Sequence, residues 1–290
     1  MKKITLALLV QIVISSTCIA GGPWTQEKGN GYFKISEWWV IYDQHYNKNG
    51  DIIKIPHSKI FNTTIYAEYG ITNKLTGILN AVPFSNVQGK IIVRDNMNNY
   101  TTEVDEVTAM GNADLGLKYQ LMSSENSLPL SATVLFGLPT GDNAAGEQNT
   151  LQTGDGAFKV LAQLDAGNSF TLGNINGFGS AHFGYNLRSD DYSDELKFGV
   201  DLGLSFFDSK FWLITRINAV ESLKNGSRND DDGTSFIYAN NTEYVGLALE
   251  GSYLLTDNIG ISAEAAGAFR AENVAAAPSY SLGIFYQLKK

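Results

Sequence analysis

The chain has 290 residues, of which 43% are hydrophobic and 18% charged, and its formal net charge is −9. The acidic balance makes nucleic acid an unfavourable partner, because a polyphosphate backbone attracts basic surfaces and repels acidic ones. Six prolines and 29 glycines, with 14 Tyr and 15 Phe, resemble the composition of sheet-rich barrels that use aromatics at interfaces and glycine where strands coil.

Residues 1–20 have the pattern of an export signal. Lys2 and Lys3 form a basic start, an apolar stretch follows, and Ala20 ends a short run of small residues. We predict cleavage after Ala20, which leaves 21–290 as one domain with 19 basic and 30 acidic residues. A lipoprotein site at Cys18 is the disfavoured alternative, because no Leu or Val stands at the expected place before it. Cleavage after Ala20 removes the single cysteine and excludes disulfides, iron–sulfur clusters and thiol catalysis.

The rest of the chain alternates apolar and polar residues with a period of two. In 113–121, Ala113, Leu115 and Leu117 alternate with Asp114, Gly116 and Lys118, so one face of a strand is apolar and the other polar. No stretch of ten residues shows helical spacing, and no later stretch could span a membrane as a helix. After an export signal, this pattern predicts a transmembrane antiparallel up-and-down β-barrel, with lipid outside and water inside.

Twelve strands are expected in chain order, and the first and seventh are irregular. Their ranges are 30–42, 59–71, 75–85, 108–121, 128–138, 155–165, 170–187, 195–207, 211–224, 239–255, 259–270 and 279–288.

The expected connections alternate between short and long. Short turns are predicted at 72–74, 123–127, 166–168, 208–210 and 256–258, and the longer polar loops include 43–58, 86–107, 139–154 and 225–238. Short periplasmic turns and longer extracellular loops are typical of outer-membrane barrels. Twelve strands then place both chain ends on the periplasmic side.

If the apolar face contacts lipid, the charged residues of the strands line the lumen. The predicted lumen-lining residues of a transport path are Glu68, Asp114, Lys118, Lys159, His182, Lys197, Asp201, Arg216, Glu250, Glu264 and Arg270. An unpaired charge on the lipid face would cost about 2–4 kcal/mol near mid-membrane. Two interpretations stay open: a polar channel wall with its own electrostatic field, or a cross-barrel ion-pair network that stiffens a narrow lumen. Because both signs are present, strong ion selectivity is not implied.

Catalysis and metal binding are the weaker hypotheses. A lipid hydrolase would need Ser and Asx partners for a histidine that reaches the outer face, whereas His182 is expected to point into the lumen. Acidic runs at Asp190-Asp191 and 230–232 could hold Ca²⁺, but solvated loop charge is the simpler account. The Gly-rich stretches 137–142 and 153–156 lack the features of a phosphate loop and are expected at the outer rim. We therefore expect no enzyme, no cofactor and no metal.

The last strand, 280–288, resembles the carboxy-terminal signal read by the barrel-assembly machinery, although Lys289 and Lys290 follow it. Further stretches at 22–29, 82–84, 111–121, 135–142 and 153–165 occur in an order similar to one family. This part of the chain resembles the outer-membrane MetA-pathway transporters of phenol degradation, which are related to the long-chain fatty-acid transporter superfamily.

The resemblance implies a barrel and uptake of small hydrophobic molecules. The fatty-acid transporters carry a long amino-terminal plug, whereas few residues precede the first strand here, so any gate is expected from infolded loops or lumen side chains.

The sequence therefore predicts a protein of the Gram-negative outer membrane. The leading hypothesis is a channel for passive uptake of small, hydrophobic or aromatic molecules. The alternative is a structural or adhesive barrel that acts through loops 43–58, 86–107 and 225–238, with Tyr42, Tyr46 and Tyr100 at its rim. Expected partners are outer-membrane lipid, lipopolysaccharide, the barrel-assembly machinery and an unidentified small molecule, and nucleic acid is not among them.

Overall fold

The computed structural model describes residues 21–94, 100–123, 128–228 and 237–290. Within these ranges there is no helix long and apolar enough to cross a membrane. The strands are β1 (Gly31–Tyr46), β2 (Ile52–Thr72), β3 (Leu75–Arg94), β4 (Tyr100–Ala109), β5 (Ala113–Met122), β6 (Leu130–Leu138), β7 (Lys159–Leu172), β8 (Ile175–Arg188), β9 (Glu195–Phe206), β10 (Phe211–Ser222), β11 (Glu243–Leu254), β12 (Ile259–Glu272), β13 (Val274–Ala275) and β14 (Ser279–Leu288).

These strands form one closed antiparallel barrel, which confirms the predicted fold class. Most strands pair with their neighbours in the chain, although β12 pairs β14 and the short β13 pairs β1. β1 closes the wall by pairing β14 from Gly31↔Leu288 to Val40↔Ser279. β4 and β5 share one position in the wall: β4 pairs the far half of β3, and β5 pairs its near half. The wall is therefore twelve strands around, and its closure leaves β4, which pairs only β3, as a described strand with a free edge.

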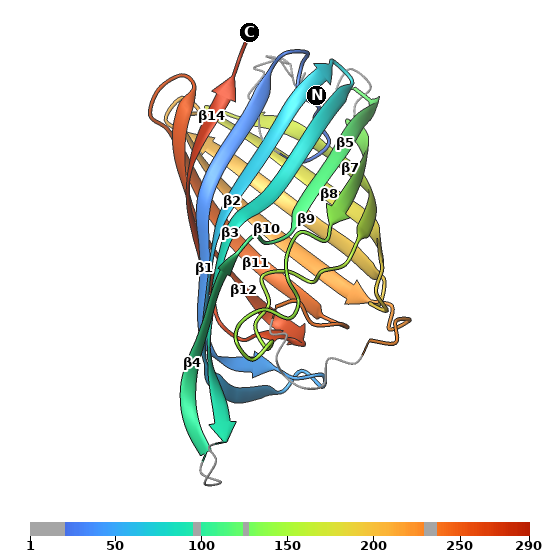
Figure 1. Ribbon diagram of the computed structural model, residues 1–290. Coiled ribbons are helices and arrows are strands. Elements are labelled where there is room, and N and C mark those ends of the chain that lie inside the picture. The colour runs from blue at the N-terminus through green and yellow to red at the C-terminus, as the bar shows by residue number, and fades with distance from the viewer. Residues whose placement is uncertain (1–20, 95–99, 124–127, 229–236) are drawn as a thin grey trace, which may run out of the picture.

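The two ends of the barrel differ (Figure 1). One end carries the C-terminus and the short connections, and we call it the terminal end. The other, which we call the loop end, carries the long segment 139–158 and the projecting β3–β4 hairpin. The predicted signal peptide, the predicted turn at 123–127 and the acidic run 230–232 lie wholly or mostly outside the described residues.

The β3–β4 hairpin corrects the expected loop at 86–107. Pairs from Ser85↔Ala109 to Arg94↔Tyr100 extend the sheet well past the rim. The outer face of the hairpin is polar near its base, where the Asn86 amide donates to Glu106 and Thr108 at 2.8 Å each. The sequence resembles a loop here because apolar residues do not keep to one face: Val87 is buried on the inner face, whereas Val104 is exposed on the outer one. Loop 43–58 is also shorter than expected, since β1 and β2 leave only 47–51 between them.

The turn expected at 166–168 was also misplaced. Those residues lie inside β7, which pairs β8 as far as Leu172↔Ile175. The connection is the two-residue turn 173–174, where Gly173 has φ +62°. A glycine with positive φ at the first central position suits a hairpin turn whose twist matches the flanking strands.

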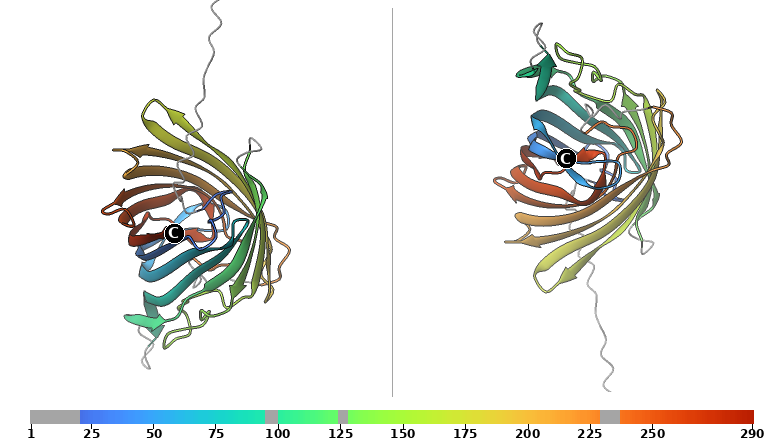
Figure 2. Two further views of the ribbon diagram at one scale, coloured as in Figure 1. Left: turned by 90° about the horizontal axis from the view of Figure 1, so that it is seen from above. Right: turned by 90° about the horizontal axis from the view of Figure 1, so that it is seen from below.

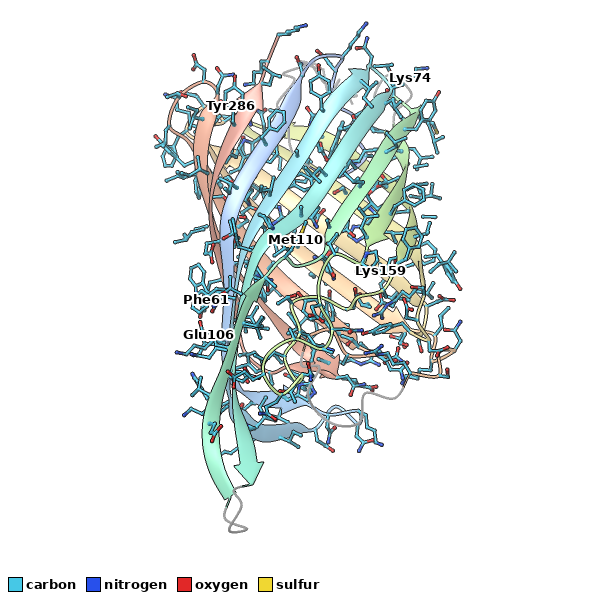
Figure 3. All side chains as sticks on the ribbon, viewed as in Figure 1. Phe61, Lys74, Glu106, Met110, Lys159 and Tyr286 are labelled. Carbon is cyan, nitrogen blue, oxygen red and sulfur yellow. The ribbon has the colours of Figure 1, made fainter. Side chains whose placement is uncertain are left out.

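The outer face is apolar and carries aromatic pairs at two levels. Phe33 and Tyr286 pair with ring centroids 6.5 Å apart toward the terminal end, and Trp39 and Tyr280 pair at 5.9 Å toward the loop end. Figure 3 labels Phe61 and Tyr286 on this surface. Such belts are typical of the two interfaces of a bilayer. Glu37 is a charged residue between these two aromatic pairs: it lies between Phe33 and Trp39 on the outer face of β1, where the Thr63 hydroxyl donates to its carboxylate at 2.8 Å.

Candidate transport path through the barrel

The strand register turns most of the predicted lumen residues inward. Inward-facing residues are Glu68, Asp114, Lys118, Lys159, His182, Lys197, Asp201, Arg216, Glu250 and Glu264, and they come from β2, β5, β7, β8, β9, β10, β11 and β12. Arg270 is different. A bulge between Val245 and Gly246 shifts the β11–β12 register, so Arg270 lies opposite the outward Val245 and is exposed outside. The prediction for Arg270 was wrong, because a bulge cannot be read from alternation alone.

One ion-pair network spans the lumen on the side of β9 to β12. Arg216 lies 2.9 Å from both Glu250 and Glu264, and 4.0 Å from Asp201. Lys34, on the non-adjacent β1, reaches the other oxygen of Glu250 at 3.1 Å. These charges are therefore paired in a network that connects β1 to β11. This arrangement agrees with the interpretation of the lumen charges as a cross-barrel ion-pair network.

A second network lies on the opposite wall and is more buried. Glu68 has no exposed surface, and Lys118 approaches its Oε1 to 3.3 Å. The Tyr66 hydroxyl donates to Oε1 at 2.6 Å, and the Gln26 amide donates to Oε2 at 2.8 Å. A buried carboxylate is tolerated only when its lone pairs are satisfied in this way, since desolvation of a charge costs several kcal/mol.

Gln26 belongs to the segment 21–30, which folds into the terminal end of the lumen. Its backbone N–H donates to the Thr76 hydroxyl at 2.8 Å, and the Trp24 ring meets Phe178 edge-on at 5.7 Å. Seen along the barrel axis, this dark blue stretch lies within the ring of strands (Figure 2). The expectation that only loops or lumen side chains could narrow the barrel was therefore incomplete. Ten residues are enough to narrow the lumen, because the Gln26 backbone and the Trp24 ring hold this segment against the wall.

The loop end is narrowed by the segment 139–158, which folds inward. Ala145 and Leu151 join a buried apolar cluster with the inward residues Val40, Tyr42 and Ile60. Thr153, which has no exposed surface, donates to the Met110 carbonyl at 2.9 Å and so ties the segment to the wall. The Gly-rich stretches 137–142 and 153–156 were expected at the outer rim, yet Thr153 and Asp155 are buried. Infolding of this loop agrees with the expectation that a loop narrows the barrel.

Charged contacts lock the neighbouring loops to this segment. Arg188 is 2.6 Å from Glu195 and 3.7 Å from Asp155, and Lys159 is 3.0 Å from Asp155. The Tyr192 ring is stacked between the guanidinium groups of Arg188 and Arg228, which lie 4.1 Å and 4.5 Å from its centroid. Cation–π contacts of this kind strengthen as water is excluded. We call this set of residues the loop latch.

Two ionisable groups beside the loop latch have shifted pKa values. Burial raises the pKa of Tyr238 to about 12, with the Asp155 charge adding to the rise. Burial alone would raise the pKa of Asp194, but it lies below its usual range, because hydrogen bonds from Asn225, the Arg188 backbone and Tyr185 favour the carboxylate. Asp194 is therefore a structural acceptor of the loop.

The structure also places the other residues that the sequence singled out as candidates. His182 lies in the lumen opposite Asp165, and within the described residues no serine hydroxyl is hydrogen-bonded to it. No group of three or more potential metal ligands occurs in the described part of the chain. Tyr42 is buried inside the barrel instead of standing at the rim. Tyr46 ends β1, where its hydroxyl donates to the Ala268 carbonyl at 3.5 Å, and the side chain of Tyr100 is not among those described.

Several lumen residues were missed from the sequence. Tyr32 and Lys34 face inward on β1, and Trp212 and Phe285 do so on β10 and β14. Their strands carry large apolar residues on both faces, so alternation is weak there. The period of two along a strand could have found them. A residue faces the lumen when it lies an even number of positions from a lumen residue on the same strand, or directly opposite a lumen residue on the neighbouring strand.

Solved structures of similar shape are outer-membrane barrels. The COG4313 outer membrane channel from Pseudomonas putida F1 matches with a TM-score of 0.61 and 16% identity, over 93% of this chain and 99% of that one. The KdgM porin in complex with disordered oligogalacturonate is more distant, with a TM-score of 0.48, 8% identity, and coverage of 89% and 99%. No protein-family model and no curated protein matches the chain.

The class follows from the fold. The protein is an outer-membrane-type β-barrel with an apolar outer surface and a polar, internally narrowed lumen.

Proposed function

We propose that the protein is a channel of the Gram-negative outer membrane for passive uptake of small molecules, with the terminal end toward the periplasm. The observation that carries this proposal is the contrast between the two faces of one closed wall. The outer face is apolar between two aromatic belts, whereas ionised side chains and hydrogen-bonded polar groups fill the inner face. A lumen lined in this way is hydrated and offers a route for solutes.

The two internal segments limit what can pass. Segment 139–158 at the loop end and segment 21–30 at the terminal end both occupy the lumen. Conductance should therefore be small, and the permeants should be small as well. The fold shared with the COG4313 outer membrane channel supports a channel. Uptake of hydrophobic or aromatic molecules, and kinship with the phenol-degradation transporters, are supported by the order of the sequence motifs alone.

The test is reconstitution of the purified protein without residues 1–20. We expect small, reproducible conductance steps in planar bilayers and swelling of liposomes in small neutral solutes. The folded barrel is verified by its heat-modifiable migration on gels. If such protein gives neither conductance steps nor liposome swelling, the channel function is contradicted.

A second candidate is surface interaction through the β3–β4 hairpin. The hairpin projects beyond the loop end and presents Asn86, Gln88, Glu106 and Thr108 on its outer face (Glu106 is labelled in Figure 3). Shortening the hairpin separates the two functions: loss of cell or matrix binding with intact flux supports adhesion, whereas unchanged binding contradicts it.

A further inference from the structure

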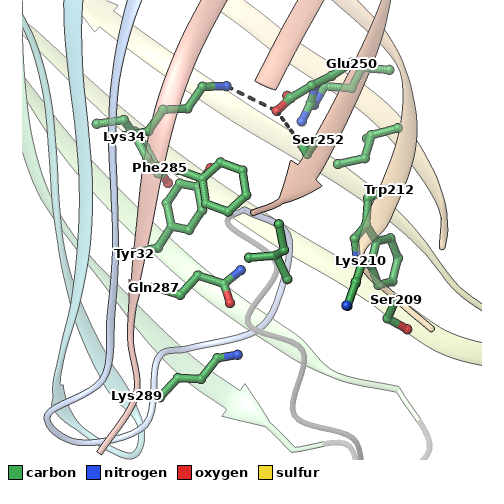
Figure 4. Close-up of a pocket in the computed structure, with 14 residues that line it drawn as sticks. Tyr32, Lys34, Ser209, Lys210, Trp212, Glu250, Ser252, Phe285, Gln287 and Lys289 are labelled. Atoms are coloured by element: carbon green, nitrogen blue, oxygen red, sulfur yellow. Dashed lines mark hydrogen bonds and ion pairs between the residues drawn. The ribbon is translucent and has the colours of Figure 1, made fainter. Parts of the chain in front are cut away.

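A cavity of about 240 Å³ lies in the terminal half of the lumen, between β1, β2, β10, β11 and β14. Figure 4 shows its lining, with Lys34 and Glu250 at one end and Lys210 and Lys289 nearer the other. We call this cavity the terminal chamber. It is smaller than the roughly 300–1,000 Å³ of pockets for drug-sized ligands, so its size suits a molecule with a single ring.

The walls of the terminal chamber are aromatic on two sides. Tyr32 and Phe285 stack at 5.6 Å with 23° between their planes, and Tyr66 meets Tyr32 at 6.3 Å. Across from them stands Trp212, which is supported by Phe178 at 5.9 Å. Flat rings on facing walls favour a planar guest by stacking and edge contacts.

Glycines on neighbouring strands hold two of these rings in place. Phe285 lies over Gly260 and Phe178 lies over Gly203, so closely that a Cβ at either glycine would collide with the ring. The aromatic walls are therefore fixed by the backbone of the barrel, and the terminal chamber is preformed.

The lining of the terminal chamber carries more cations than carboxylates. Its lining includes four cations, Lys34, Lys210, Arg216 and Lys289, and one carboxylate, Glu250. Lys34 and Arg216 already share Glu250. Lys210 has no side-chain hydrogen bond or ion pair among the described residues, and Lys289 makes only a 3.5 Å contact to the Asp257 carbonyl. Two cations at the terminal mouth are thus available to an incoming anion.

We propose that the terminal chamber binds a small aromatic carboxylate, with its ring between Tyr32, Phe285 and Trp212 and its carboxylate toward Lys210 and Lys289. The inference rests on the proposed channel function and names the substrate class of that path. A strongly hydrated inorganic anion would lose its water against aromatic walls, and an aromatic amine would be repelled by the lysines. A neutral aromatic alcohol would keep the stacking but lose the charge pairing.

Binding is tested by calorimetry on the detergent-solubilised wild-type protein at low ionic strength, where surface charge is least screened. The probes are benzoate, benzyl alcohol, benzylamine and inorganic phosphate. We expect benzoate to bind about tenfold more tightly than benzyl alcohol, which is the effect of two partly exposed charge contacts. Benzylamine and phosphate should bind more weakly still. Equal affinity for benzoate, benzyl alcohol and benzylamine would overturn the proposal.

Variants separate the charge from the rings. Lys210→Gln with Lys289→Gln should lower benzoate affinity about threefold to tenfold and leave benzyl alcohol unchanged. Trp212→Leu should weaken both ligands. Lys74→Gln is the matched control, since Lys74 stands on a turn at the same end of the barrel, away from the terminal chamber (Figure 3). Wild-type benzoate affinity in the double variant, with its barrel verified on gels, would refute the role of the lysines.

Flux assays distinguish this inference from the channel itself. If liposomes containing the protein pass no solute but the protein binds benzoate selectively, the proposed channel function is contradicted and the proposed binding site in the terminal chamber is supported. If liposomes pass solutes without preference for benzoate over benzyl alcohol, and the double lysine variant behaves as wild type, the channel function is supported and the binding site in the terminal chamber is contradicted. Preference for benzoate in both assays supports both.

Discussion

The two ends of the lumen are narrowed by different forces. At the loop end, segment 139–158 packs apolar residues against Val40, Tyr42 and Ile60, and the loop latch holds Asp155 of the same segment by ion pairs. At the terminal end, segment 21–30 is tied mainly by hydrogen bonds to Glu68 and Thr76. Apolar packing excludes water and rejects charge, whereas a hydrogen-bonded polar surface can exchange its partners with water. The comparison indicates a steric barrier at one end and a polar, chemically selective region at the other.

The largest effect is expected from breaking the buried pair at the terminal end. Lys118→Met leaves Glu68 charged and uncompensated in a site without solvent exposure, which should cost about 3–5 kcal/mol of unfolding free energy. The double variant Glu68→Gln with Lys118→Met should recover much of this loss, since no buried charge remains. Denaturant unfolding in lipid measures both, and equal stability of the single and double variants would show that the pair is not coupled.

At the loop end the corresponding change is a cavity. Leu151 is 7% exposed within the apolar cluster, so Leu151→Ala should destabilise the folded-in loop by about 2 kcal/mol. The loop would then leave the lumen more often, and single-channel conductance should rise or become noisy. Leu187→Ala, on the outer face at the same end, is the control and should leave the conductance unchanged. An unaltered trace for Leu151→Ala would place the barrier elsewhere.

A smaller effect tests whether the outer face of β1 contacts hydrocarbon. Glu37 faces the hydrocarbon region, so Glu37→Gln should stabilise the barrel by roughly 1 kcal/mol while keeping the hydrogen bond from Thr63. Glu106→Gln, on the projecting hairpin beyond the rim, should change little. Unfolding in bilayers of matched thickness reports the difference. Destabilisation by Glu37→Gln would mean that its charge has a partner.

The smallest effect is a pH dependence of the loop end. The folded-state pKa of Asp194 is lowered, so its contribution is fully present above the ordinary Asp value of about 3.9 and is lost as pH falls through the folded pKa. Loop contacts near Asp194 should therefore persist to pH values below the normal Asp range. Asn225→Ala, which removes a hydrogen bond at 2.9 Å, should move the loss to higher pH. Hydrogen exchange in the loop, measured from pH 5 to 3, would contradict this if both proteins loosened together.

The sequence predicted the fold because a barrel in lipid obeys a simple rule of alternation. Strands with regular alternation, such as β9 and β10, were placed within a few residues, and ten of eleven lumen residues face inward. The failures have local causes. The β3–β4 hairpin carries apolar residues on both faces and so lacks regular alternation, the turn at 173–174 was hidden inside alternating residues, and a bulge reversed Arg270.

The interior could be predicted less well than the wall. Segments 21–30 and 139–158 contain no periodic pattern, so nothing in them shows that they fold inward. Their positions depend on contacts with residues distant in sequence, such as Gln26 with Glu68 and Leu151 with Ile60. The aromatic walls of the terminal chamber likewise come from strands that meet only when the barrel closes.

The central claim is that water meets the inner face of the wall and lipid meets the outer one. Single cysteines introduced in turn at 196, 197, 198, 200, 201 and 202 of β9, in protein lacking residues 1–20 and reconstituted in liposomes, test it most directly. A small, water-soluble thiol reagent should label 197 and 201 and spare the other four positions, which a lipid-soluble reagent should reach instead. Gly199 and Gly203 are left unchanged because neither has room for a side chain. Uniform labelling along the strand, or the opposite parity, would contradict a barrel with lipid outside and solvent within.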